Sequence, residues 1–127
     1  MRRETQLLRQ VHPQFVQQGK PSSQVFRPTP KDEKLLSVYD GDQIGPSDAF
    51  EHYTNRLGFS SIGILAVTVG ECQTCELKSR PDPPAFPEHA VIDFREYGER
   101  ETKKKAKQLK AFANRRGWLY RYDSSPN

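Results

Sequence analysis

The sequence predicts an α+β domain, in which a small sheet, mixed or mostly antiparallel, packs against two principal helices. Three observations lead to this fold class. The apolar run over 62–69 suits a strand buried on both faces better than a helix. The segments between Pro46 and Gly58 and over 101–116 repeat apolar residues at intervals of three and four, as amphipathic helices do. Stretches rich in β-branched and aromatic residues surround them, and strands mixed with helices favour layered packing.

The N-terminal residues predict an arm with a short helix. Leu7, Leu8 and Val11 would share one face of that helix. Pro13 would end it, because proline has no amide hydrogen to donate. The predicted organisation is an arm over residues 1–23, a single α+β domain over 24–122 and a disordered tail over 123–127.

The first half of the domain predicts one strand and the first principal helix. A short extended piece is expected over 24–27, which overlaps a distinctive run, Phe26 to Asp32, that indicates no mechanism. A strand is expected over 34–40, because β-branched and aromatic residues there are followed by an Asp-Gly-Asp turn. Asp48 favours a helix start just before it, and Gly58 favours the helix end.

The second half predicts three more strands and the second principal helix. After the strand over 62–69, the segment 76–88 holds four prolines and predicts an irregular loop. Residues 89–94 and 118–122 predict strands. Between them, the helix over 101–116 would place its inward stripe against the sheet and end at Gly117; that stripe is Ala106, Leu109, Phe112 and Ala113.

Composition and length favour a small cytoplasmic protein. The chain has 127 residues, of which 34% are hydrophobic and 28% charged, enough for one modest core. No segment approaches the roughly 18 consecutive apolar residues of a membrane-spanning helix. No apolar run follows the basic N-terminus, as one would in a secretory signal, and two cysteines are too few for a secreted disulfide framework. We therefore expect a cytosolic protein that does not bind membranes.

The positive charge is concentrated near the C-terminus. The whole chain has a formal net charge of +4. The segment 95–122 has ten basic and three acidic residues, a net charge of +7, which leaves −3 for the remainder. Such an asymmetry produces a local positive field, which attracts polyanions.

The basic residues of the helix over 101–116 are the candidate nucleic-acid contacts. Most are absent from the inward stripe, so we expect them to face solvent together and to neutralise phosphates. Aromatic residues just beyond the helix could stack on exposed bases. The alternative is a merely solvated face, because bases near a helix C-terminus also favour the helix dipole. The candidate nucleic-acid-binding residues are Lys103, Lys104, Lys105, Lys107, Lys110, Arg115 and Arg116.

The cysteine pair is a weak candidate for metal binding or redox chemistry. Cys72 and Cys75 have the spacing of half a zinc site, but a structural zinc needs four ligands and the sequence has no second pair. A redox pair is expected between a strand and a helix start, whereas this one leads into a proline-rich loop. The main interpretation is two ordinary thiols at a strand end. We expect no metal and no cofactor.

His89 is the weak candidate for a catalytic residue. Histidine titrates near neutral pH and transfers protons readily, and His89 lies beside Glu88 and close to Asp93. His12 and His52 are lesser candidates, the first in a weakly structured region and the second on a predicted helix surface. Neither a nucleophile elbow nor a metalloprotease motif occurs, so a binding protein is expected ahead of an enzyme.

These features give three ranked hypotheses. The first is a small non-catalytic binding or regulatory protein, which engages nucleic acid or an acidic protein surface through its basic C-terminal helix. The second is a protein–protein adaptor subunit of a larger complex, suggested by a small polar domain without a catalytic motif. The third is a small hydrolase or nuclease that uses His89. The oligomeric state is not indicated by the sequence.

Overall fold

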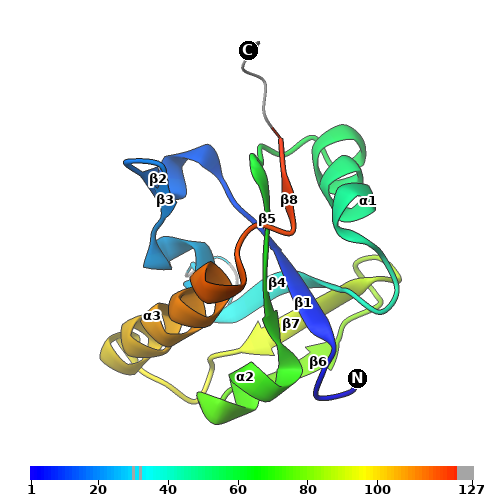
Figure 1. Cartoon of the computed structure of the whole chain (residues 1–127). Coiled ribbons are helices and arrows are strands. Elements are labelled where there is room, and N and C mark those ends of the chain that lie inside the picture. The colour runs from blue at the N-terminus through cyan, green and yellow to red at the C-terminus, as the bar shows by residue number, and fades with distance from the viewer. Residues whose placement is uncertain (30, 32, 123–127) are drawn as a thin grey trace.

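In the computed structural model, a curled antiparallel sheet forms the centre of the fold (Figure 1). The structure describes residues 1–29, 31 and 33–122. The strand order is β6-β7-β4-β1-β5-β8, and each neighbouring pair is antiparallel. With two longer helices packed on this sheet, the predicted α+β fold class is confirmed. The strands are β1 (Gln6–Gln10), β4 (Leu35–Asp40), β5 (Gly63–Thr68), β6 (Lys78–Pro81), β7 (His89–Asp93) and β8 (Tyr120–Arg121).

Helices and short turns connect these strands. α1 (Pro46–Glu51) continues into a π-helical turn (His52–Arg56), α2 (Val69–Thr74) follows β5 directly, and α3 (Glu99–Arg116) leads to β8. The segment between β1 and β4 contains two 3₁₀ turns, η1 (Pro13–Phe15) and η2 (Ser23–Phe26), and a small ribbon of β2 (Val16–Gln17) with β3 (Lys20–Pro21).

Residues 6–10 form an inner strand, so the predicted N-terminal helix is wrong. β1 pairs with β4 on one side and β5 on the other, and Leu8 lies opposite Tyr39 and Ala66. Successive side chains of a strand point to opposite faces, and Leu7 and Leu8 therefore enter different cores. The predicted arm over 1–23 thus contributes a central strand to the sheet.

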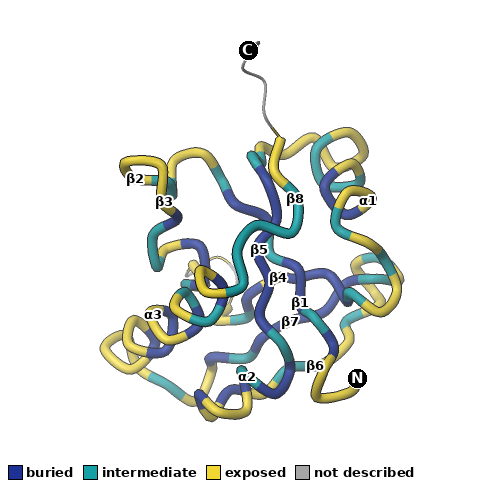
Figure 2. Tube along the Cα trace, viewed as in Figure 1, coloured by how far each residue is buried: buried dark blue, intermediate teal, exposed yellow. Residues whose placement is uncertain are grey.

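The two faces of the sheet bury separate sets of side chains. α2, α3 and η2 cover one face, where Leu65 of β5 shares a core with Leu109 of α3. α1 covers the other face, where Ala66 of β5 shares a core with Phe50. Figure 2 shows the inner strands in dark blue and the outer surfaces of the helices in yellow. Because β5 contributes to both cores, the prediction of a strand buried on both faces is confirmed.

Two further local predictions are wrong. Residues 23–26 form the helical turn η2 instead of an extended piece, because the turn buries Val25 and Phe26 fully against α3. The segment 76–88 is not a loop throughout, since Lys78–Pro81 forms β6 and pairs with β7. Proline is tolerated there because β6 is an edge strand. On its outer side no neighbouring strand needs the backbone amide hydrogen that proline lacks.

The remaining predicted elements are confirmed. Strands lie over 35–40, 89–93 and 120–121, and the two principal helices begin at Pro46 and Glu99. Gly58 and Gly117 adopt positive φ angles of 74° and 88°, a left-handed conformation that ends a helix at little cost for glycine. The predicted tail over 123–127 lies outside the described residues. None of the helices in the described part of the chain has the length and apolar character that a membrane span requires.

Replacing Leu7 tests the central position of β1. Leu7 is fully buried, and Leu7→Ala should lower the free energy of unfolding by about 2–5 kcal/mol, because it leaves a cavity. Urea denaturation followed by circular dichroism measures the change. Leu57→Ala is the matched control at a site 39% exposed, and it should cost less than about 1 kcal/mol. Similar small losses in both variants would contradict a central strand at residues 6–10.

Candidate functional site

The outer side of α3 is the first candidate site. α3 begins after Gly98 with two acidic residues in its first turn and ends with two arginines in its last, an order that complements the helix dipole. Its inner side is held against the sheet by Ala106, Leu109 and Ala113, which are fully buried. The helix is therefore fixed in rotation, and its 3.6-residue period decides which basic side chains face solvent.

Six basic side chains lie within an arc of about 140° on that outer side, at 100° per residue. None of them is buried, and Glu99 and Glu101 flank the arc instead of interrupting it. Lys103 forms an ion pair with Glu99, with 3.2 Å between Nζ and Oε1. Within the described part of the chain, the other five form no ion pair. We call this set the cationic face: Arg100, Lys103, Lys104, Lys107, Lys110 and Arg115.

Lys105 and Arg116 do not face solvent with the other predicted residues. Lys105 is buried, its Nζ donates a hydrogen bond to the carbonyl of Cys75 at 2.7 Å, and it lies 4.2 Å from the centre of the Tyr97 ring. Arg116 donates two hydrogen bonds to the Glu71 carboxylate, at 2.9 and 2.8 Å, which ties the end of α3 to α2. Burial raises the pKa of Glu71, but the hydrogen bonds and charge of Arg116, together with hydrogen bonds from Thr68, lower that pKa overall.

A groove of about 380 Å³ adjoins the start of the cationic face. Arg27 and Lys34 line it together with Lys103 and Glu99, so basic side chains outnumber acidic ones. The Nε of Arg27 is buried and has no hydrogen-bond partner among the described residues. Sequence reasoning missed Arg27, because only the contact between η2 and α3 brings it beside a helix that lies far along the chain.

The aromatic residues after α3 are not placed on the cationic face. Trp118 is partly buried against the core beneath α3, whereas Tyr120 packs against the other core. Tyr122 is exposed, and its ring stacks on that of Phe50 with 5.8 Å between centres. These side chains thus pack mainly within the fold, and they do not form one platform alongside α3.

Cys72 lies in the second half of α2 and Cys75 follows the last residue of that helix, so the pair is not at a strand end as predicted. A redox pair lies between a strand and the start of a helix, whereas this pair lies at the C-terminal end of α2. Both thiols are free and buried. Burial raises the pKa of Cys72 to about 12 and also raises that of Cys75. Both therefore remain protonated at neutral pH, whereas the thiolate is the form that reacts or binds metal.

His89 is oriented by Asp82, not by the neighbours expected from the sequence. Its Nδ1 lies 2.9 Å from a carboxylate oxygen of Asp82 and 3.2 Å from the Asp82 carbonyl. With the Nδ1 hydrogen donated there, Nε2 is left as a proton acceptor. Asp93 binds Arg95 and Arg80 instead, and the hydrogen bonds from Arg95 hold its pKa well below the usual range.

The other histidines are engaged by local structure. The Nδ1 of His12 accepts a hydrogen bond from the amide of Gln14, and the Nδ1 of His52 lies 2.8 Å from the Tyr39 hydroxyl. No serine, threonine or cysteine in the described residues hydrogen-bonds to the ring of His89. The pair of His89 and Asp82 can therefore act as a base, but it lacks an aligned protein nucleophile.

Neither metal-site geometry nor comparison with known proteins assigns a function. Within residues 1–29, 31 and 33–122, no group of three or more histidine, cysteine and carboxylate side chains could hold a metal ion. No protein-family model, curated protein or solved structure matches the chain significantly. The chemistry of the side chains is therefore the basis for assigning a function.

Two lysines of α3 provide a matched test of this geometry. Lys105→Ala should lower the free energy of unfolding by roughly 2 kcal/mol, because it leaves the buried carbonyl of Cys75 without its charged donor. Lys107→Ala removes an exposed side chain of the same type and should leave the unfolding curve unchanged. Urea denaturation of both variants checks this. An equal response would mean that Lys105 is as solvated as Lys107.

The ion pair of Arg116 with Glu71 predicts a pH dependence. Because the folded-state pKa of Glu71 is lowered, its charged form stabilises the fold above the unfolded-state pKa, and that stability is lost as the pH falls through the folded-state value. The stability difference between wild type and Glu71→Gln should therefore be largest near neutral pH and shrink below about pH 5. Denaturation at several pH values measures it, and a constant difference would contradict the ion pair.

Proposed function

We propose that the protein is a non-catalytic nucleic-acid-binding protein, which contacts phosphates with the cationic face of α3. The observation that carries the proposal is the alignment of six basic side chains, of which one forms an ion pair within residues 1–29, 31 and 33–122. When such a row of basic side chains neutralises phosphates, the counterions condensed on the nucleic acid are released. This release supplies most of the free energy of sequence-independent binding.

The dimensions of the cationic face suit a nucleic-acid backbone. The helix rises about 1.5 Å per residue, so Arg100 and Arg115 are separated by roughly 22 Å along the axis, or about six base pairs of duplex. Four of the six side chains are lysines, whose flexible ammonium groups act as point charges. Phosphate contacts fix position without reading bases, so we expect binding with little sequence preference.

The groove beside Arg27 extends the same surface. Arg27 and Lys34 add two positive charges next to Lys103, where the cationic face begins. A backbone that follows α3 would meet this groove at one end. An acidic protein is the competing partner, since carboxylates also pair with lysine, but it would need carboxylates spaced to match the row.

Neutralising two central lysines tests the proposal. Lys104→Gln combined with Lys107→Gln should weaken binding to a labelled duplex and to a single strand, because two phosphate contacts are lost. The slope of log affinity against log salt should fall in magnitude by up to about 2, since each contact contributes roughly 0.9. Fluorescence anisotropy at several salt concentrations measures both effects.

The matched control removes the same net charge elsewhere. Lys20→Gln combined with Arg56→Gln changes exposed basic residues of β3 and of the π-helical turn, both outside α3, and should bind like wild type. Equal weakening in both double variants would place the effect in net charge and not in the cationic face. The proposal is wrong if wild type fails to bind at low salt, or if polyglutamate of equal charge competes as well as the oligonucleotide.

A further inference from the structure

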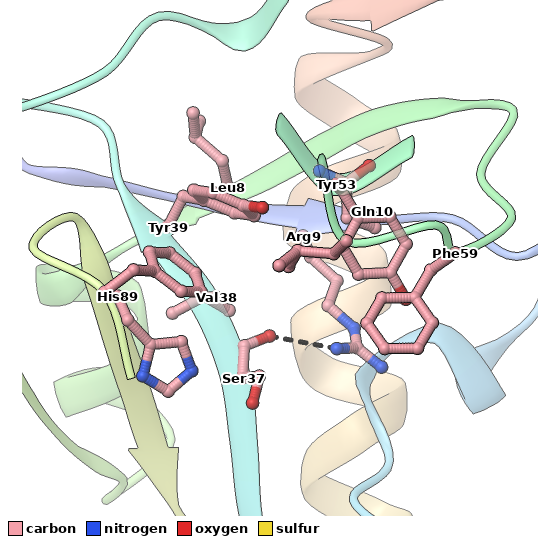
Figure 3. Close-up of a pocket in the computed structure, with 11 residues that line it drawn as sticks. Leu8, Arg9, Gln10, Ser37, Val38, Tyr39, Tyr53, Phe59 and His89 are labelled. Atoms are coloured by element: carbon pink, nitrogen blue, oxygen red, sulfur yellow. Dashed lines mark hydrogen bonds between the residues drawn. The ribbon is translucent and has the colours of Figure 1, made fainter. Parts of the chain in front are cut away.

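A pocket of about 330 Å³ opens beside β1 and β4 (Figure 3). Most of its aromatic lining belongs to the core that α1 covers, and Arg9 and Val38 line it as well. Leu8 of β1 and Tyr39 of β4 lie on one side of it, and His89 of β7 lies at its margin. Its volume is at the lower end of the range of about 300–1,000 Å³ that small-molecule sites occupy. The pocket therefore suits a small molecule and not a peptide or a nucleic-acid strand.

Part of the wall is supplied by an unusual backbone turn. After α1, the amide of Leu57 donates to the carbonyl of His52, five residues back, at 3.0 Å. Tyr53 projects from this π-helical turn, and Phe59 follows it. Such turns are rare, and they recur at functional sites because they displace side chains from regular helical positions. Here the turn brings Tyr53 to the pocket.

Aromatic rings line the pocket in two groups. The rings of Tyr53 and Phe59 lie 5.1 Å apart on one side, and Figure 3 shows Tyr39 and His89 on the other. Phe86 joins the second group, with its ring centre 5.0 Å from Tyr39 and 4.9 Å from His89. Phe59 is 56% exposed although it is apolar. A ligand between the two groups of rings would therefore cover apolar surface that is exposed to solvent in the free protein.

Hydrogen-bonding groups accompany the rings. Gln10 is 6% exposed, and its Nε2 donates to the Ala49 carbonyl at 3.1 Å, whereas its Oε1 has no hydrogen-bond partner in the part of the chain that the structure describes. A buried acceptor without a donor is costly, and a ligand N–H that reached Gln10 would satisfy it. The Nε2 of His89 is a second acceptor when Asp82 holds the other nitrogen. None of the described residues that line the pocket is acidic, which disfavours a cationic ligand.

We propose that this pocket binds a small planar nitrogen heterocycle, a free nucleobase or nucleoside, between the two groups of aromatic rings. Such a ring offers a π-face to the aromatic walls and N–H donors to Gln10 and His89. The ligand needs no phosphate, and no residue of α3 lines the site. It is therefore a second site, independent of the proposed nucleic-acid surface.

Titration with nucleosides tests the pocket directly. Adenosine, guanosine, cytidine and uridine are added separately to the full chain, and amide chemical shifts are followed by NMR. We expect at least one nucleoside to give saturable shifts at residues of the pocket. Phe59→Ala should weaken that binding by about five-fold or more, because one stacking wall is lost. Phe59→Tyr keeps the ring and should bind within about two-fold of wild type.

Two controls separate this site from general aromatic or charge effects. Tyr122→Ala removes an aromatic side chain that is 54% exposed and lies outside the pocket, so nucleoside affinity should not change. The Lys104→Gln and Lys107→Gln double variant should also bind nucleosides like wild type, whatever happens to its oligonucleotide affinity. The inference is overturned if none of the four nucleosides gives saturable shifts, or if Phe59→Ala binds as tightly as wild type.

Discussion

The pairing of β1 with both β4 and β5 is the interaction on which the rest of the structure depends. Without β1 the sheet would separate into three strands on one side and two on the other. Leu7 and Leu8 are both almost completely buried, and because they point to opposite faces, each anchors a different core. One short strand thus fixes the surface against which α3 packs and the surface against which α1 packs.

This arrangement gives the molecule two chemically different sides. On the side of α3, the inner stripe of the helix is held by the core and the outer arc is left to basic residues. The ion pair of Arg116 with Glu71 holds the C-terminal end of that helix against α2 and restrains its rotation. On the side of α1, the π-helical turn and the loop before β7 surround an aromatic pocket. The cationic face and the aromatic pocket therefore share no lining residue.

The sequence predicted α1 and α3 correctly from apolar residues at intervals of three and four, and β5 correctly from one continuous apolar run bounded by turn residues. The prediction for residues 6–10 was wrong because two adjacent leucines in a short segment fit one helical turn as well as they fit a strand buried on both faces. The sequence analysis did not predict α2, although Thr68 and Glu71 form a capping box. The apolar run that precedes α2 obscured this signal of a helix start. Lys105 differs from the neighbouring lysines of α3 only in its position around the helix axis, which places it on the buried side. The pairing of His89 with Asp82 depends on the path of a loop, which no local pattern specifies.

The central strand also has a consequence during synthesis of the chain. β1 is made first, but β4 begins only at Leu35 and β5 only at Gly63. Contacts across such separations close long loops, which slows folding relative to a protein built from local contacts. A strand with free backbone groups is meanwhile a template for pairing with other chains. In the nascent chain, the side of β1 that pairs with β5 therefore stays unpaired until Thr68 has left the ribosome.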